Sequence, residues 1–258
     1  DLCRPLITTV FQFKGDVIMT DRRYLKWYNK IGYGAGDIAG NVIYAFISTF
    51  IMIYLTDTAG LNAGIVGTLM MISKFFDGFT DVIFGALIDK TKTKMGKARP
   101  WMLWPYIGNG VMLVALFAVP MELGDVAKYA YFFICYTLLH AVFYTANNIA
   151  YSALTALITR NGNERVQMGS IRFIFAFLTS LLIQSVTVNA VTALGGGAEG
   201  WKWIAVIYAI IGLVINTFSV FSVKELPESE LEHREEQDTP KEKIGYLETA
   251  KLLVSNKY

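Results

Sequence analysis

The sequence predicts an all-α membrane protein that crosses the bilayer six times. Of its 258 residues, 54% are hydrophobic and 17% are charged, whereas about a quarter of the residues in soluble domains are charged. Six stretches are apolar and long enough to cross a hydrocarbon core, which takes about 20 residues. Lys and Arg gather in every second connection between these stretches, as they do in multi-pass membrane proteins.

The six stretches differ in the charges that they contain. The second holds Lys74, Asp77 and Asp81, whereas the first holds only Asp37. The fourth lies between Lys128 and Arg160 and is interrupted only by His140, and the third has no charged residue. We expect the six helices at residues 31–56, 61–88, 101–119, 128–160, 172–195 and 203–223.

The basic residues predict the orientation, because short loops rich in Lys and Arg stay on the cytoplasmic side. The connections on the opposite side contain only two basic residues, Lys128 and Lys202. Both ends of the six-helix bundle are therefore expected in the cytoplasm. The residues on that side are Arg22, Arg23, Lys26, Lys30, Lys90, Lys92, Lys94, Lys97, Arg99, Arg160 and Arg165.

The chain divides into three parts by composition. Residues 1–18 lack the order of a cleaved signal peptide, and we interpret them as a non-native leader before a start at Met19. Residues 19–224 form the transmembrane bundle. Residues 225–258 begin with a polar stretch of mixed charge and are expected to be a cytoplasmic linker. Because transporters are often built from two bundles, we expect the linker to lead to a second one.

Several classes of function have no support in the sequence. The net charge of +2 gives no signature of nucleic-acid binding. Cys3 and Cys135 have no paired spacing, so we expect neither a disulfide nor a structural metal site. We find no nucleophile elbow, phosphate loop or metal-ligand spacing, and we expect a protein that is not an enzyme and needs no cofactor.

The charged residues of the second stretch are expected to lie on one face of a helix. At 100° per residue, Lys74, Asp77 and Asp81 fall within an arc of about 60°. A charge at this depth costs roughly 3 kcal/mol, so such residues normally face a cavity and pair. Two carboxylates and one ammonium leave a spare negative charge, which favours a site for Na+ or H+. The alternative is an ion pair that locks helices together.

Polar side chains elsewhere suggest the wall of a binding site for a hydroxyl-rich ligand. Asn41 offers an amide at membrane depth, and a cluster in the fourth stretch adds Tyr144, Thr145, Asn147, Asn148, Tyr151 and Ser152. The alternative is interhelical hydrogen bonding, worth about 0.6 kcal/mol per contact. We expect Gly32, Gly34, Gly36 and Gly40 to permit close helix packing or to thin the helix beside a cavity.

The positions of three further residues in their helices suggest roles for them. Arg172 is either a cytoplasmic anchor that snorkels or a buried hydrogen-bonding fork, and the sequence favours neither. Asp37 is early in its helix, where we expect solvation and an architectural role. His140 is expected to be a packed or hydrogen-bonded helix residue.

Five stretches between residues 31 and 175 keep a characteristic order and spacing. They are GYGAGD followed by Asn41, YLTDTAGL, GIVGTLMMISKFFDGFTDVIFGALIDKTKTKMGKARPW, YTANNIAYSAL, and SIRF with Arg172. Together they resemble the glycoside-pentoside-hexuronide:cation symporter family of the major facilitator superfamily. The resemblance implies the amino-terminal bundle of a twelve-helix fold in a bacterial-type inner membrane, with the carboxy-terminal half absent from this chain.

The resemblance also implies roles for residues. Asp77 and Asp81 match the cation-binding carboxylates, and Lys74 replaces a residue that is usually Arg. Asn41 and Asn148 stand where the melibiose branch has sugar-binding acids, which resembles the glucuronide and xyloside branch instead. The implied cation ligands are Asp77, Asp81, Thr80 and Thr145; the candidate substrate ligands are Asn41, Asn148, Arg172, Tyr144, Tyr151 and Lys74; and the implied gating loop contains Gly85, Asp89, Lys97 and Arg99.

These readings predict symport of a sugar or glycoside with Na+ or H+ by alternating access. The expected partners are the sugar, the coupling cation and the lipid bilayer. The alternative is a membrane sensor or assembly module of the same fold that does not transport. A channel is disfavoured, because the charges form one cluster and not repeated rings.

Overall fold

The computed structural model describes residues 22–227. By internal contacts the chain divides into two units, Asp1–Glu225 and Leu226–Tyr258, and the described helices all lie in the first. The predicted leader at residues 1–18, Cys3 and nearly all of the predicted linker lie outside the described residues. Cys135 is a free, buried cysteine.

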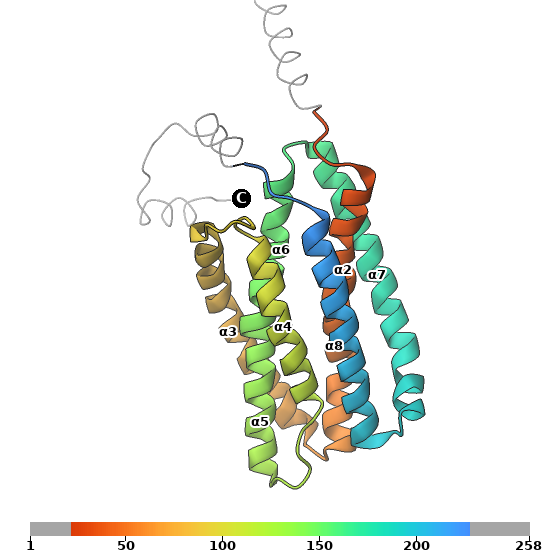
Figure 1. Ribbon diagram of the computed structural model, residues 1–258. Helices are drawn as coiled ribbons and strands as arrows, with labels where there is room; N and C mark the ends of the chain where they lie inside the picture. Colours follow the sequence, from red (N-terminus) through yellow and green to blue (C-terminus); the bar gives the residue numbers. More distant parts are fainter. Residues whose placement is uncertain (1–21, 228–258) are drawn as a thin grey trace, which may run out of the picture. The chain divides into compact units, whose positions relative to one another are not determined.

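The described part of the chain is helical and contains no β-strand (Figure 1). Two π-helical turns, η1 and η2, continue neighbouring α-helices without a break. The elements are α2 (Trp27–Ile53), η1 (Tyr54–Thr58), α3 (Ala63–Lys90), α4 (Arg99–Leu116), α5 (Asp125–Thr137), η2 (Leu138–Tyr144), α6 (Thr145–Ile158), α7 (Gly162–Ala193) and α8 (Gly197–Ser222).

Within residues 22–227, four helical runs are long and apolar enough to cross a membrane: Trp27–Thr58, Asp125–Ile158, Gly162–Ala193 and Gly197–Ser222. The other two helices are α3, which carries three charged side chains in its middle, and α4, which has 18 residues. The finding supports an all-helical membrane protein. It does not by itself extend to six crossings.

The largest error in the predicted helix limits is at the start of α7. The helix begins at Gly162, well before the predicted residue 172. Asn161 caps it, because its Oδ1 accepts hydrogen bonds from the backbone N–H groups of Asn163 (2.9 Å) and Glu164 (3.3 Å). Hydropathy detects only the apolar part of a helix, so the polar first turns were missed. For the same reason α8 begins at Gly197 and not at residue 203.

Helix α2 is the centre of the packing, since it contacts both α7 and α8 along its length (Figure 1). Close approach depends on Gly36, where an added Cβ would lie 2.7 Å from Tyr151 Cε2 and 2.9 Å from Ser219 Oγ. At Gly34 it would lie 2.6 Å from Ile171 Cγ2. These contacts agree with the predicted packing role of the glycines. Gly40 differs, because no atom lies within 4 Å of the corresponding position.

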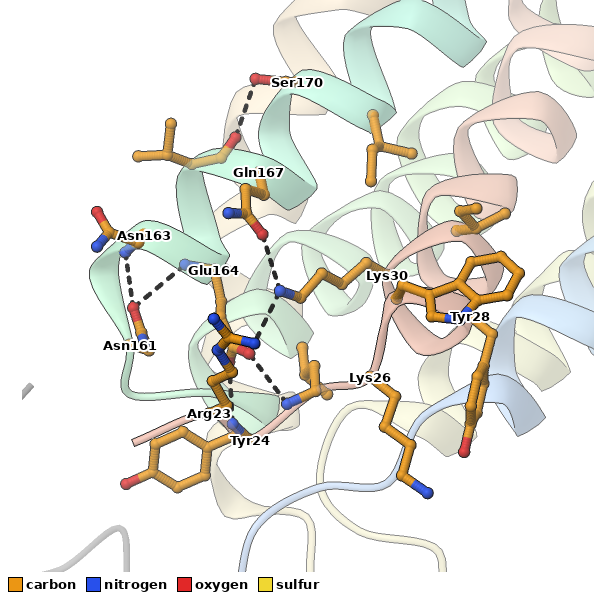
Figure 2. Close-up of a pocket in the computed structure, with 15 residues that line it drawn as sticks. Arg23, Tyr24, Lys26, Tyr28, Lys30, Asn161, Asn163, Glu164, Gln167 and Ser170 are labelled. Atoms are coloured by element: carbon orange, nitrogen blue, oxygen red, sulfur yellow. Dashed lines mark hydrogen bonds and ion pairs between the residues drawn. The ribbon is translucent and has the colours of Figure 1, made fainter. Parts of the chain in front are cut away.

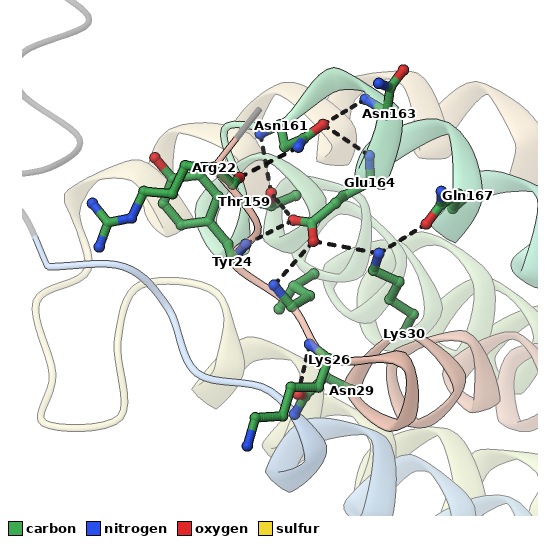
Figure 3. A network of polar contacts seen from close by, with 11 residues as sticks. Arg22, Tyr24, Lys26, Asn29, Lys30, Thr159, Asn161, Asn163, Glu164 and Gln167 are labelled. Carbon is green, nitrogen blue, oxygen red and sulfur yellow. Dashed lines mark hydrogen bonds and ion pairs between the residues drawn. The ribbon is translucent and has the colours of Figure 1, made fainter. Parts of the chain in front are cut away.

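A buried carboxylate ties the segment before α2 to the start of α7 (Figure 3). Glu164 is 2% exposed and accepts hydrogen bonds from the backbone N–H groups of Tyr24 (3.3 Å) and Leu25 (3.1 Å). It also accepts one from Thr159 Oγ1 (2.6 Å) and pairs with Lys30 Nζ at 3.3 Å. Glu164 is therefore satisfied only when both segments are in place.

We expect Glu164→Ala to destabilise the bundle strongly. Removing one partner of a buried ion pair costs about 3–5 kcal/mol, and each kcal/mol lowers Tm by about 2–4 °C in a domain of this size. Thermal unfolding of the purified protein should therefore shift by on the order of 10 °C. Glu199→Ala is the control, because Glu199 is 70% exposed and lies 3.8 Å from Lys202. Equal shifts in the two variants would contradict this role for Glu164.

Candidate functional site: two polar clusters within the bundle

An ion pair joins α2 to α7 inside the bundle. Arg172 Nε donates to Asp37 Oδ2 at 2.6 Å, and Arg172 Nη2 lies 3.4 Å from Asp37 Oδ1. The side chains of Arg172 and Asp37 are 24% and 16% exposed. Arg172 is thus a hydrogen-bonding fork and not a snorkelling anchor, which decides between the two readings. Asp37 was expected to be solvated, and this expectation is wrong because Arg172 holds it.

Two tyrosines complete this arrangement, which we call the arginine cluster (Asp37, Arg172, Tyr33 and Tyr151). The Tyr151 hydroxyl lies 2.9 Å from Asp37 Oδ2 and 2.8 Å from the Tyr33 carbonyl oxygen, so two acceptors share one proton. The guanidinium carbon of Arg172 lies 4.1 Å from the centre of the Tyr151 ring. Arg172 Nη1 also lies 3.4 Å from the Tyr33 hydroxyl. The guanidinium is held by charge, hydrogen bonds and an aromatic face.

The amides predicted to bind substrate lie close to this cluster in sequence and on its helices. Asn41 is one turn after Asp37 and donates from Nδ2 to the Asp37 carbonyl oxygen at 2.9 Å. Ser180 Oγ on α7 lies 3.5 Å from Asn41 Oδ1. Asn148 is exposed on α6. At helical spacing it shares a face with Tyr144 and Tyr151, so α2, α6 and α7 each contribute polar groups.

A second group of polar side chains, the α3 cluster, centres on Asp77. Lys74 Nζ donates to Asp77 Oδ2 at 3.0 Å, and the two side chains are 53% and 23% exposed. The pair lies within one helix, so it does not lock two helices together as the alternative reading required. Asp81 is exposed on the same helix, one turn after Asp77.

Several buried polar atoms in this region have no hydrogen-bond partner within residues 22–227. They include Asp77 Oδ1 and Ser73 Oγ on α3, and Thr137 Oγ1 and His140 Nε2 at the junction of α5 and η2. The elements that carry these atoms are neighbours, since α3 packs on both α5 and η2. Buried polar groups are normally satisfied, and exceptions occur at functional sites or where ions bind. His140 is packed, as predicted, at 5% exposure.

The two predicted threonine ligands bond to backbone within their own helices. Thr80 Oγ1 lies 3.1 Å from the Phe76 carbonyl oxygen and 3.0 Å from that of Asp77. Thr145 Oγ1 donates to the His140 carbonyl oxygen at 3.0 Å, across the π-helical turn. Single π-helical turns inside α-helices often mark functional sites. Here the turn sets the positions of His140 and Tyr144.

A row of aromatic rings runs between the two clusters. Tyr136 lies 4.5 Å from His140, His140 lies 5.9 Å from Tyr144, and Tyr144 stacks on Tyr44 of α2 at 5.9 Å, measured between ring centres. Asp77 is close enough to Tyr136 to interact with it electrostatically. The row therefore connects α3 to α2 through η2, in the middle of the helical run Asp125–Ile158.

The predicted gating loop is held by a residue that the sequence did not single out. Glu225, just after α8, accepts hydrogen bonds from the backbone N–H groups of Lys97 (2.6 Å), Ala98 (3.0 Å) and Arg99 (3.0 Å). Arg99 Nε donates to the Val220 carbonyl oxygen at 2.9 Å. The carboxylate thus caps the start of α4, where negative charge is favourable.

The other two residues of that predicted loop lie on the last turns of α3. Asp89 is exposed there, and no atom lies within 4 Å of a Cβ added at Gly85. Arg99 and Lys97 are therefore tied to α8 and Glu225, whereas Gly85 and Asp89 have open surroundings. Their gating role stays a prediction.

A cavity of about 1100 Å³ lies at the basic end of the bundle (Figure 2). It is formed by the segment from Arg23 to Ile31 and by the first turns of α7, with Lys30 and Gln167 joined across it at 2.8 Å. None of the predicted cation or substrate ligands lines it. The candidate site is therefore the pair of polar clusters and not this cavity. Within the described residues no three His, Cys, Asp or Glu side chains come together as a metal centre would need.

Sequence reasoning missed the role of Asp37 and of Tyr33 as partners of Arg172. The signal was weak, because the two members of the ion pair lie 135 residues apart. An isolated Asp in one predicted span and an isolated Arg in another are the available hint, since charges at membrane depth normally pair. Glu164 and Glu225 stood in polar stretches that resembled ordinary loops.

Comparisons with known proteins place the chain among transport proteins. A family model described as "MFS/sugar transport protein" matches residues 32–258. The chain is 34% identical over 206 residues to the isoprimeverose transporter of Lactiplantibacillus pentosus, covering 78% of this chain and 42% of the relative. It is 32% identical over 202 residues to an inner membrane symporter of Escherichia coli (strain K12), covering 78% and 44%.

A third relative is named for an acidic sugar. The chain is 33% identical over 155 residues to a glucuronide carrier protein homolog of Escherichia coli (strain K12), covering 60% of this chain and 34% of the relative. The chain thus spans less than half of the length of each of these curated relatives.

Proposed function

The chain belongs to the MFS/sugar transport protein family, and from this we propose that it supplies the amino-terminal bundle of a secondary transporter. The transporter would carry a sugar or glycoside together with Na+ or H+ by alternating access. The relatives named as an isoprimeverose transporter and an inner membrane symporter support this class of activity. The six helical runs would all cross the inner membrane, with the basic residues at the start of α2 and in the α3–α4 connection on the cytoplasmic side.

The observation that carries the proposal is the presence of two separate polar clusters in one bundle. Asp77 has a buried carboxylate oxygen without a hydrogen-bond partner among the described residues, and Asp81 follows on the next turn. A bound cation or proton satisfies such an oxygen. We assign cation binding to Asp77 and Asp81, with Thr80 and Thr145 as further oxygen ligands.

The sugar site would lie on the other side of the aromatic row. The arginine cluster offers a fixed guanidinium. Asn41 on α2, Asn148 on α6 and Tyr144 on η2 add donors and acceptors. Lys74 on α3, which pairs with Asp77, would link this site to the cation site. Side-chain amides and hydroxyls suit a ligand that is rich in hydroxyl groups.

Coupling between the two sites follows if each ligand favours the same arrangement of helices. Cation binding would neutralise the charge on α3 and change its packing on α5 and η2. The aromatic row would pass that change to Tyr44 and Tyr144, beside the sugar site. By thermodynamic linkage, each ligand would then bind more tightly when the other is present.

The exposed surface of α3 supports a partner beyond this bundle. Phe75, Phe79 and Val82 are 69%, 73% and 74% exposed, and they lie on the helix that carries the charged residues. Lipid alone would leave Asp81 unsolvated at a cost of several kcal/mol. A second six-helix bundle would cover this side and complete the site between the two halves.

Counterflow in proteoliposomes tests whether the full-length protein transports at all. Vesicles loaded with an unlabelled xyloside should take up labelled xyloside transiently above its equilibrium level. This readout needs no ion gradient, because the cation concentration is the same on both sides of the membrane. Binding of the glycoside without exchange would support a membrane sensor and contradict the proposed transporter.

A further inference from the structure

The cavity at the basic end of the bundle carries a net positive charge (Figure 2). Arg23, Lys26 and Lys30 line it, and among the described residues around it only Glu164 is acidic. Three positive charges and one negative charge leave a net charge of +2. Glu164 is 2% exposed and is already bonded to Thr159 and to Lys30. A concave surface with this charge attracts an anion.

The three basic residues differ in how accessible they are. The side chain of Lys30 is 13% exposed, because it pairs with Glu164 at 3.3 Å and donates to Gln167 Oε1 at 2.8 Å. Arg23 and Lys26 are exposed. Lys26 Nζ lies above the ring of the neighbouring Tyr28, 5.7 Å from its centre. Arg23 and Lys26 are therefore placed to meet an anion that approaches the cavity from the surface.

Two exposed aromatic side chains also line the cavity. Trp27 is 72% exposed and Tyr28 is 49% exposed, and both lie in the first turn of α2. Their rings meet edge to face, with centres 6.1 Å apart. Trp and Tyr gather at the membrane–water interface, at the level of the lipid headgroups. The opening of the cavity therefore lies at headgroup level when the bundle crosses the bilayer as proposed.

The cavity continues from its charged end onto an apolar wall. Ile31 on α2 and Val166 on α7 line it and are 41% and 70% exposed. Ile171 also lines it and lies about 13 Å along α7 from Gly162, the first residue of that helix. A small soluble anion would leave this apolar wall uncovered. A ligand with an anionic head and an apolar chain covers both parts of the cavity.

We propose that the cavity binds an anionic phospholipid of the cytoplasmic leaflet, such as phosphatidylglycerol. Its phosphate lies at Arg23 and Lys26, and an acyl chain runs along Ile31 and Val166. Basic pockets between transmembrane helices on the cytoplasmic side suit anionic headgroups. The proposal rests on the proposed function, because that function places the basic end of the bundle at the cytoplasmic face of a membrane. None of the predicted cation or substrate ligands lines the cavity, so the lipid site is separate from the transport site.

Two lipids with the same acyl chains test the proposal. Phosphatidylglycerol has a net negative charge, whereas phosphatidylcholine is zwitterionic. Native mass spectrometry of the full-length protein in detergent measures the affinity for each lipid. The wild-type protein should bind phosphatidylglycerol at least tenfold more tightly. The double variant Arg23→Gln, Lys26→Gln should lose about tenfold or more of this affinity, since each basic residue near an anionic headgroup contributes about fivefold.

A matched double variant separates this site from general attraction to a basic surface. Lys90→Gln, Lys94→Gln removes two exposed positive charges from the end of α3 and the α3–α4 connection, on the same predicted side of the membrane. Neither lysine lines the cavity, and their loss should leave the affinity for phosphatidylglycerol unchanged. Equal losses in the two double variants would overturn the proposal.

Crosslinking on the wild-type protein locates the site without any variant. A photoreactive phosphatidylglycerol should label peptides from residues 23–31 and 162–171, and labelling confined to other regions overturns the proposal. Excess glycerol 3-phosphate, a soluble anion without acyl chains, should not displace the lipid; displacement at equal concentration would indicate a site for soluble anions instead. Xyloside counterflow in a protein that does not prefer phosphatidylglycerol contradicts the lipid site alone. Labelling at the site without counterflow contradicts the proposed transport alone.

Discussion

Replacing Asp77 by Asn is expected to abolish uphill uptake while the protein still inserts and folds. The variant keeps the size of the side chain but loses the charge that a coupling cation would neutralise. A tenfold cation gradient is worth about 1.4 kcal/mol and supports roughly tenfold accumulation at a stoichiometry of one. In Asp77→Asn the internal concentration of the glycoside should not exceed the external concentration.

The control for this variant is Asp125→Asn. Asp125 is an exposed carboxylate in the first turn of α5, outside the α3 cluster, and its loss should leave accumulation unchanged. Asp81→Asn is expected to behave like Asp77→Asn. Undiminished accumulation in both α3 variants, at equal protein levels in the membrane, would show that these carboxylates are not the coupling site.

A single methyl group at Gly36 is expected to damage both stability and substrate binding. The Cβ of Gly36→Ala would lie 2.7 Å from Tyr151 Cε2 and 2.9 Å from Ser219 Oγ, so the ring or α8 must move. Overpacking of this kind costs about 1–3 kcal/mol. Displacing Tyr151 would also weaken its hydrogen bond to Asp37, which is worth about 1.5–3 kcal/mol as a bond to a charged group. Glycoside affinity should fall about tenfold or more.

Gly40→Ala provides a matched comparison one turn along the same helix. No atom lies within 4 Å of a Cβ at this position, and Ala is favoured over Gly in a helix by about 1 kcal/mol. Thermal unfolding and equilibrium binding of the two variants should therefore diverge. Equal stability and equal glycoside affinity in Gly36→Ala and Gly40→Ala would contradict this prediction. The close approach of α2 to Tyr151 would then not be needed for stability or for substrate binding.

Much of the fold could be predicted from the sequence, because membrane helices leave a strong local signal. Apolar length and alternating basic loops located the six helical runs of residues 22–227, four of which are long and apolar enough to cross a membrane. The start of α7 was wrong because its first turns are polar: Asn161 caps them and Glu164 is buried by contacts with the segment before α2. A hydropathy pattern cannot register a carboxylate whose partners come from another part of the chain.

In the candidate site, too, contacts within one helix could be predicted from the sequence, whereas contacts between helices could not. Lys74, Asp77 and Asp81 could be grouped from helical spacing, since they share one helix, and Lys74 and Asp77 do pair. The ion pair of Asp37 and Arg172 could not be predicted, because it depends on how α2 packs against α7. Whether Asn41, Asn148 and the two threonines bind ligands stays a prediction, and so does the gating role of Gly85 and Asp89.

The most direct measurement of the central claim is cation movement driven by sugar alone. Proteoliposomes containing the full-length protein are prepared with equal Na+ and pH on both sides, and a neutral xyloside is added outside. We expect inward movement of Na+ or H+ with the xyloside, detected by an ion-sensitive dye, and its loss in Asp77→Asn. Equilibration of the xyloside without any movement of either cation would contradict coupled transport.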